Sequence, residues 1–259
     1  MTDNTVHLEI RNLTHFFGGL QALENINITM RKEEIAGLIG PNGAGKTTVF
    51  NIVSGFYAPT QGDIIVSGTR INGKKPHDIA AMKIGRTFQN IRLWNEMTVL
   101  DNIRISQHYR LEYNAADAFF HTARYKRREA EITSKAWELL DIFKLADLAY
   151  EYPKNIPYGI QRRVEIARAL SLQPDLLLLD EPAAGLSAVD TVQLIDYVTW
   201  LHDNFHLTIW MIEHQMDVIM KLCEHITVID FGKEIASGSP EEIKNNPDVI
   251  KAYLGDGQL

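Results

Sequence analysis

The sequence Gly40-Pro41-Asn42-Gly43-Ala44-Gly45-Lys46-Thr47 decides the fold. It matches in full the pattern Gly-x4-Gly-Lys-Ser/Thr, which is typical of loops that hold phosphate groups. The short apolar run before it, residues 34–39, predicts a buried strand. After it, the apolar stripe of Val49, Ile52 and Val53 predicts a helix over residues 47–55. This order of strand, loop and helix is the context that the motif requires, and it disfavours a chance glycine-rich turn.

The residue types of this loop suit the binding of a triphosphate. Glycines let the backbone turn tightly, so that successive N–H groups point inward at phosphate oxygens, and the following helix directs its positive end at them. Lys46 is placed to contact the β- and γ-phosphates as a point charge, and the Thr47 hydroxyl is suited to ligate Mg²⁺. We count Thr48 with the same nucleotide-binding set. The sequence therefore predicts a site for MgATP.

A second run carries two acidic side chains to the end of a strand. Residues 176–179 are all leucine and are followed by Asp180 and Glu181. Ligands bind at the carboxyl edge of a parallel sheet, so both carboxylates are expected beside the phosphates. Asp180 is predicted to hold Mg²⁺ and Glu181 to orient or deprotonate the attacking water. Taken alone, the run could equally be a strand that ends in an ordinary acidic turn.

Two single residues gain weight from this combination. Gln89 follows Phe88 well downstream of the loop and is a candidate ligand of Mg²⁺ or of the attacking water. His214 follows the apolar run 208–212, so it also stands at a strand end and is a candidate contact of the γ-phosphate. The plain alternatives are a surface amide and a structural histidine.

The remainder of the chain predicts an α/β fold. Residues 98–149 mix charged and apolar residues at helical spacing, and residues 153–159 interrupt that pattern before a further predicted helix at 160–170. Apolar runs at 207–212 and 226–229 predict strands, and residues 240–254 predict one or two short helices. Alternating strands and helices imply a mostly parallel sheet with helices on both faces.

Composition limits the function further. The formal net charge is −7, which disfavours a nucleic-acid partner. The single cysteine, Cys223, cannot form an internal disulfide and is expected in the core. Residues 1–10 lack the apolar region of a signal peptide, and no apolar run approaches the roughly 20 residues that span a bilayer. We expect a soluble or peripheral protein.

In order and spacing, these motifs resemble the ATP-binding subunits of ABC transporters along nearly the whole chain. The resemblance implies a single ABC ATPase domain, residues 1–259, with a P-loop NTPase core and an antiparallel β subdomain. It also implies an inserted helical subdomain at about 90–170 and a helical tail at about 240–259. The implied activity is Mg²⁺-dependent hydrolysis of ATP to ADP and phosphate.

The resemblance assigns three further sites. Phe17, before Gly18, matches the aromatic that stacks on adenine; Phe16 is the alternative, and a core phenylalanine is the plain interpretation. The loop 185–190 matches another family segment. The signature segment, residues 156–160, completes the ATP site of the opposite subunit through Tyr158 and Gly159. Here it departs from the usual pattern, because Pro157 stands where the family has Ser or Ala and Ile160 replaces Gln.

Residues 86–94 and the tail are similar to the longer ATPase subunit of branched-chain amino acid importers. This implies a place at the cytoplasmic face of the inner membrane. The implied partners are a second ATPase subunit, which is a homologue or a second copy of this chain, two membrane permeases and, indirectly, an extracytoplasmic solute-binding protein. Alternatives are a urea or amide importer, a lipopolysaccharide exporter, or an ABC ATPase outside transport; the last usually has two cassettes or long coiled coils. The basic cluster within residues 124–128 would face anionic lipid or a permease loop, or be an ordinary solvated helix face.

Overall fold

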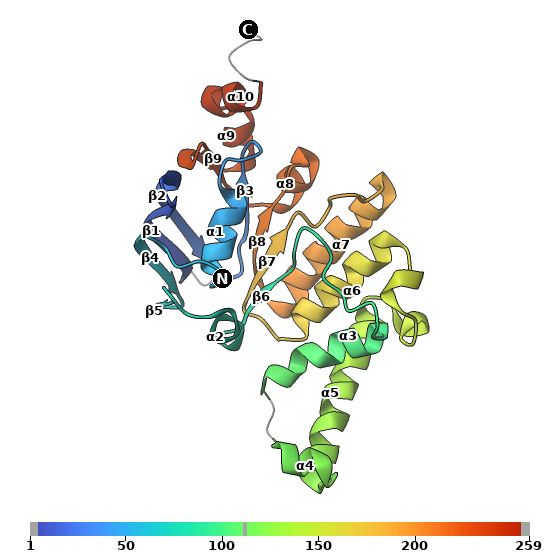
Figure 1. Ribbon diagram of the computed structural model, residues 1–259. Helices are drawn as coiled ribbons and strands as arrows, with labels where there is room; N and C mark the ends of the chain where they lie inside the picture. The colour runs from blue at the N-terminus through green and yellow to red at the C-terminus, as the bar shows by residue number, and fades with distance from the viewer. Residues whose placement is uncertain (1–4, 111–112, 255–259) are drawn as a thin grey trace.

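Two β-sheets flanked by helices organise the chain (Figure 1). The structure, a computed structural model, describes residues 5–110 and 113–254. The smaller sheet is antiparallel, in the order β2-β1-β4-β5. Its strands are β1 (Val6–Phe17), β2 (Leu20–Arg31), β4 (Gln61–Val66) and β5 (Thr69–Arg70). The turn between β1 and β2 forms at Gly18, whose φ of 57° suits glycine.

The larger sheet has the order β10-β9-β3-β8-β7-β6, and only β10 runs antiparallel to its neighbour. Its strands are β3 (Ile35–Ile39), β6 (Ile84–Arg86), β7 (Leu176–Asp180), β8 (Thr208–Ile212), β9 (His225–Asp230) and β10 (Lys233–Gly238). The predicted mostly parallel α/β fold is thereby confirmed. Because β3, β7 and β8 are parallel neighbours, the segments that follow them meet at one edge of the sheet.

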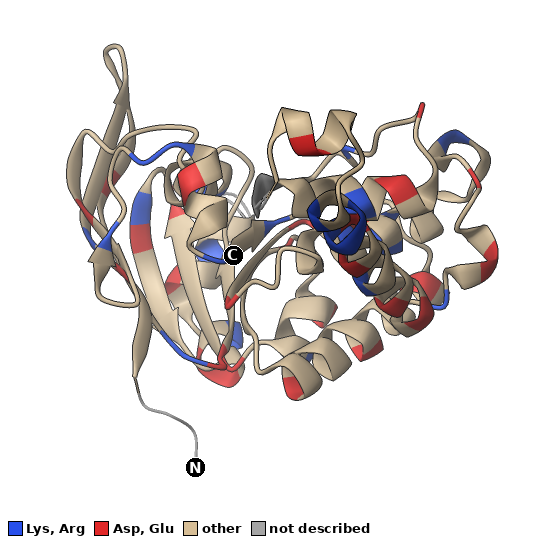
Figure 2. Ribbon diagram, turned by 90° about the horizontal axis from the view of Figure 1, so that it is seen from below, with Lys and Arg blue, Asp and Glu red and all other residues tan. Residues whose placement is uncertain are grey.

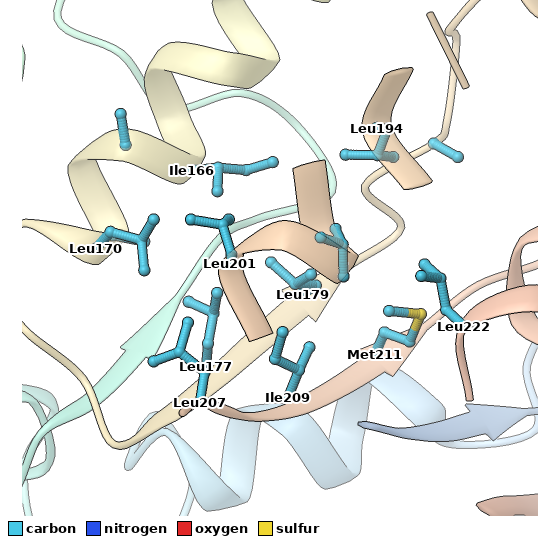
Figure 3. Close-up of a cluster of buried hydrophobic side chains, with 14 of the residues drawn as sticks. Ile166, Leu170, Leu177, Leu179, Leu194, Leu201, Leu207, Ile209, Met211 and Leu222 are labelled. Carbon is cyan, nitrogen blue, oxygen red and sulfur yellow. The ribbon is translucent and has the colours of Figure 1, made fainter. Parts of the chain in front are cut away.

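Helices cover both faces of this sheet, which explains why its strands are apolar throughout. On one face Leu177, Leu179 and Met211 pack against α6 (Tyr158–Leu170), α7 (Ala188–Phe205) and α8 (Met216–Leu222), as Figure 3 shows. On the other face Trp210 contacts Phe50 of α1 (Lys46–Val53), with 4.7 Å between ring centroids. The predicted core position of Cys223 is confirmed, since this side chain is buried on the same face of the sheet as Leu177 and Met211.

The predicted helical stretch after residue 98 forms a projecting arm. In Figure 1, α3 (Val99–Ser106) and α5 (Ala123–Ile142) extend away from the sheets, with the short α4 (Ala115–Phe119) at the far end. The 20-residue α5 buries Ile132, Ala136, Leu139 and Leu140, one stripe of an amphipathic helix. Short 3-10 turns complete the arm: η1 (Gln107–Arg110), η2 (Ala146–Leu148) and η3 (Pro153–Asn155).

The start of α6 differs from the prediction. We expected a break over residues 153–159 and a helix from 160, whereas the helix begins at Tyr158 with Pro157 as its N-cap. The physical reason is that proline prevents a helix only before itself: the Pro157 carbonyl accepts the first intrahelical bond, from the Gln161 N–H at 3.0 Å. Gly159 therefore lies inside the first turn.

Three other helices complete the fold: α2 (Pro76–Ala81), α9 (Pro240–Lys244) and α10 (Pro247–Leu254). The last two confirm the predicted short helices of the tail, and Ser239 caps α9 by accepting a bond from the Glu242 N–H. Among the helices of the described ranges, none has the combination of length and hydropathy that crossing a bilayer demands.

Candidate nucleotide-binding and hydrolysis site

The phosphate-binding loop connects β3 to α1 and leaves the start of that helix open. Gly45 is the N-cap, with a φ of 105°. No side chain caps the helix, and its first turn contains no acidic residue. Gly40, at the other end of the loop, packs so tightly that a Cβ atom would lie 1.9 Å from the Ile229 carbonyl oxygen. The free N–H groups and the positive end of α1 are thus available to an anion.

Lys46 lies at the centre of this loop and is buried. Its Nζ donates to the carbonyl oxygens of Gly40 at 2.7 Å and Pro41 at 2.9 Å. Burial lowers the pKa of Lys46 below its ordinary value, while the charges of Glu181 and Asp180 act to raise it. The loop therefore holds an ammonium group that is poorly solvated, and a phosphate in the site would restore its electrostatic balance.

Asp180 and Glu181 follow each other at the end of β7, and the backbone turns sharply between them. Glu181 has a φ of 48°, in the left-handed region that few non-glycine residues occupy, and its N–H donates to the Ile212 carbonyl at 2.9 Å. Consecutive side chains of a strand point to opposite faces, so this turn interrupts the alternation. As a result, the two carboxylates line two neighbouring hollows, and Thr47 and Gln89 line both of them.

The three predicted catalytic side chains meet at Glu181. One carboxylate oxygen, Oε2, accepts a hydrogen bond of 2.8 Å from Gln89 Nε2. The other, Oε1, lies 3.0 Å from His214 Nε2. The carboxylate is thus fixed from two sides, by the segment after β6 and by the segment after β8, which is a suitable arrangement for orienting water.

These side chains line a hollow of about 280 Å³ together with the phosphate-binding loop. Its lining consists of predicted site residues: Asn42, Gly43, Ala44, Gly45, Lys46, Thr47, Thr48, Gln89, Glu181 and His214. Asp180 instead lines an adjacent hollow of about 330 Å³, which shares Thr47 and Gln89. Residues that are far apart in sequence therefore converge on one end of α1.

The residues present fit a magnesium ion. Asp180 Oδ1 is buried without a hydrogen-bond partner within the described ranges, while Oδ2 accepts from Arg86 Nη2 at 2.7 Å. Burial raises the pKa of Asp180, and the Arg86 guanidinium acts to lower it. No cluster of three or more acidic, His or Cys side chains in these ranges could hold a metal by itself. The unpartnered Asp180 oxygen and the Thr47 hydroxyl, which line the same hollow, suit Mg²⁺, because this ion commonly takes one or two protein ligands and completes its shell with phosphates and water.

The predicted adenine-stacking residue lies outside both hollows. Phe17 is 41% exposed, so it is not a core residue, and it makes edge-to-face contacts with His15 at 4.6 Å and Tyr57 at 5.3 Å. Phe16, the alternative, is also exposed. An open aromatic face is compatible with base stacking, which stays a prediction.

Tyr158 and Gly159 are not part of the hollow either. They lie at the start of α6 beside the loop 185–190: a Cβ on Gly159 would meet the Asp190 carboxylate at 3.3 Å, and one on Gly185 would meet the Tyr158 ring at 3.2 Å. This end of α6, like that of α1, has no capping side chain and no acid in its first turn. It is another helix terminus that no side chain caps among the residues the structure describes.

Sequence reasoning missed a buried ion pair that ties α6 to the segment containing Gln89. Arg162 and Glu165 are almost fully buried and pair at 2.8 Å. Arg162 donates to the carbonyl oxygens of Phe88 at 2.8 Å and Gln89 at 2.9 Å. Glu165 accepts from the N–H groups of Phe88 and Arg92, and burial raises its pKa. We call this pair with residues 88–92 the α6 latch.

Two other supporting side chains were missed. Arg86, besides binding Asp180, donates to Asn51 of α1. Glu213 is buried and accepts N–H bonds from Ala183 at 2.6 Å and from His214 at 3.0 Å, so it joins the segments after β7 and β8. Their positions at strand ends were the available signal, because polar residues there border the site.

Comparisons with known proteins agree with this geometry. The model of the ABC transporter family matches residues 23–184, and that of the branched-chain amino acid ATP-binding cassette transporter matches residues 233–258. The ADP conformation of an ATP-binding cassette of an ABC transporter superposes with a TM-score of 0.85, at 29% identity, over 97% of this chain and all of that one.

Relatives of known role are similar along their whole length. The high-affinity branched-chain amino acid transport ATP-binding proteins LivG of Escherichia coli and BraF of Pseudomonas aeruginosa are each 43% identical over 249 residues, 96% of this chain and 98% of theirs. The probable LivG of Archaeoglobus fulgidus is 37% identical over 250 residues, 96% of this chain and 95% of its own. The chain belongs to the ABC transporter family, among the ATP-binding subunits for branched-chain amino acid transport.

Proposed function

We propose that this chain hydrolyses MgATP and thereby drives the uptake of branched-chain amino acids through membrane permeases. The observation that carries the proposal is the Glu181 carboxylate, held between Gln89 and His214 at the edge of the hollow that the phosphate-binding loop lines. The solute class rests on the relatives, whose names give branched-chain amino acid transport.

The chain's own residues divide the work of hydrolysis. The loop N–H groups, the start of α1 and Lys46 bind and orient the phosphates. Glu181 orients the attacking water and accepts its proton, while Gln89 and His214 keep the carboxylate in place. Thr47 and Asp180, with Gln89 nearby, would hold Mg²⁺, which supplies charge neutralisation for the phosphates when bound. Phosphoryl transfer needs positioning more than covalent help, so this set is sufficient in kind.

The open end of α6 supports one of the proposed partners, a second ATPase subunit. We propose that Tyr158 and Gly159 complete the ATP site of a second ATPase subunit, which is a homologue, and that this subunit completes the site described here. Two permeases bind the pair at the cytoplasmic face of the membrane, and a solute-binding protein acts on the permeases from outside. The helical arm, within residues 90–170, transmits closure of the pair through the Gln89 segment.

Glu181→Gln tests the catalytic assignment. We expect MgATP affinity within about twofold of wild type and hydrolysis lowered roughly 10²- to 10⁴-fold, because an amide cannot accept the proton of water. Calorimetry measures the first and phosphate release the second. Glu151→Gln, at an exposed acid away from the site, is the control and should hydrolyse normally. Wild-type rates in Glu181→Gln would refute the base assignment.

The transport part has its own test. The tagged chain, purified from membranes of its own host, should bring permeases with it, and deletion should abolish uptake of labelled leucine but not of labelled urea. Loss of urea uptake instead would move the solute class to the amide importers. Failure to recover any permease would remove the support for transport while leaving ATP hydrolysis intact.

A further inference from the structure

The outer end of the helical arm exposes two adjacent phenylalanines. Phe119 and Phe120 are 78% and 74% exposed, and their rings meet edge to face at 5.1 Å. The helix α4, which ends at Phe119, buries none of its side chains. In Figure 1 it is the part of the arm furthest from the sheets, so these rings lie far from the nucleotide site. Neighbouring exposed aromatics at a projecting end are typical of a binding surface.

The same end is positively charged, in a chain whose net charge is −7. Residues 119–128 contain Arg124, Lys126, Arg127 and Arg128 and no acid. Figure 2, which views the molecule from below, shows this gathering of basic residues on the helix that points at the viewer. Within the described ranges no carboxylate lies within ion-pair distance of Arg124 or Lys126. Arg127 reaches Glu131 only at 3.9 Å.

Of the nearby acids, Glu131 pairs with Arg128 at 3.2 Å, and the others bind groups of the arm itself, so the charges of Arg124 and Lys126 remain at the surface without an acidic partner among the described residues. Asp117 accepts from the Asn114 N–H and the Thr122 hydroxyl. Glu129 is largely buried and accepts from Arg104, His108 and Tyr113. We call Phe119, Phe120, Arg124, Lys126 and Arg127 the aromatic-basic tip.

We propose that the aromatic-basic tip binds the anionic surface of a lipid bilayer. The phenylalanine rings enter the interface below the headgroups, and the arginines and lysine contact lipid phosphates. A projecting convex end suits a fluid bilayer, which needs no matching groove, better than it suits a rigid protein partner. The inference rests on the proposed function in one respect, namely that a permease partner holds the chain beside the membrane. The tip then adds a second, direct contact that fixes the arm relative to the bilayer.

Binding of the purified chain to vesicles tests this proposal. Wild type should sediment with vesicles of phosphatidylglycerol and phosphatidylcholine in equal parts, weakly or not at all with phosphatidylcholine alone, and less as salt increases. Arg124→Gln/Lys126→Gln should lower the partition coefficient about 25-fold, because each basic residue near the surface contributes roughly fivefold. Phe119→Ser/Phe120→Ser should lower it at least about tenfold, and Phe119→Trp/Phe120→Trp should retain it.

Matched controls exist elsewhere on the surface. Phe231→Ser removes a phenylalanine that is 88% exposed at the turn between β9 and β10, and Lys221→Gln/Lys244→Gln removes two exposed charges from α8 and α9. Both should bind vesicles like wild type. MgATP affinity should be unchanged in every tip variant; absence of nucleotide binding in wild type would instead count against the proposed function.

Three results would overturn the proposal. The first is wild type that ignores anionic vesicles. The second is tip variants that bind them as wild type does. The third is tip variants that keep vesicle binding but no longer co-purify with permeases, which would assign the tip to a protein contact.

Discussion

The starts of α1 and α6 are alike in one respect and opposite in another. Among the α-helices in the described ranges, only these two begin with neither a capping side chain nor an acid in the first turn. The start of α1 opens into a hollow that the chain closes with Gln89, Glu181 and His214. The start of α6 carries Pro157 and the partly exposed Tyr158, and the described chain places no catalytic group in front of it.

Under the proposed function, the difference means that a single chain can bind a nucleotide at the start of α1 but cannot use the start of α6 by itself. A lone chain has the groups to bind a nucleotide at α1, whereas in our proposal the open end of α6 acts only when a second subunit brings a phosphate to it. The α6 latch connects the two, because it joins α6 to the segment that carries Gln89. The following variants separate the two ends, from the largest expected effect to the smallest.

Breaking the latch should cost most. Arg162→Met leaves Glu165 buried without its partner, and we expect the free energy of unfolding to fall by about 3–5 kcal/mol. Urea unfolding followed by circular dichroism measures it. In Arg162→Met/Glu165→Met both charges of the pair are removed, so most of the stability should return. If the double variant is as unstable as the single one, packing rather than charge dominates this site.

Lys46→Ala should weaken nucleotide binding at the start of α1 and leave the start of α6 unchanged. Loss of a charged donor to the phosphates removes about 3 kcal/mol of binding free energy, a roughly 100-fold drop in MgATP affinity for the isolated chain. Titration calorimetry at low protein concentration gives the value, and Lys135→Ala, at an exposed position of α5, is the control. An affinity that stays near wild type would place the nucleotide somewhere else.

Gly159→Ala should act only in the assembled pair. Its Cβ would crowd the Asp190 carboxylate and cover the first turn of α6, which a partner's phosphate must approach. We expect hydrolysis by the assembled complex to fall about tenfold and nucleotide affinity of the isolated chain to stay the same. An equal loss of affinity in the isolated chain would erase the distinction between the two helix ends.

The smallest effect concerns alkaline pH. Burial lowers the pKa of Lys46 from its ordinary 10.5, and bound phosphate would raise it again. Affinity should therefore decline as the pH rises through the lowered pKa of Lys46, because the ammonium group then loses its charge. In that range binding should take up a proton, which calorimetry in buffers of different ionisation enthalpy detects. Lys46→Ala should show no such uptake.

Local patterns predicted the parts of the site that depend on neighbours in sequence. The phosphate-binding loop, the leucine strand before Asp180 and the strand before His214 follow from a few consecutive residues each. Arg162 and Glu165 could not be found in this way: three residues apart on a helix, they resemble an ordinary surface pair. Only the chain more than 70 residues earlier, which packs over them, makes the pair buried.

The backbone turn at Glu181 likewise could not be predicted from the sequence pattern. Alternation along β7 predicts that Asp180 and Glu181 point to opposite faces, and the left-handed φ of Glu181 removes that alternation. The bond from its N–H to Ile212 stabilises the turn, and that contact depends on how β8 pairs with β7. Strand pairing is a long-range property, so the meeting of Gln89, Glu181 and His214 required the structure.

The buried Cys223 has a practical consequence for measuring how two ATPase subunits move relative to one another. It is the chain's single cysteine, and burial raises the pKa of its thiol, so the reactive thiolate is scarce at neutral pH. A cysteine introduced at an exposed position, such as Val189 in the first turn of α7, would therefore be the one site to take a maleimide spin label or dye. Distances between labelled subunits can then be followed through an ATPase cycle without first replacing a native thiol.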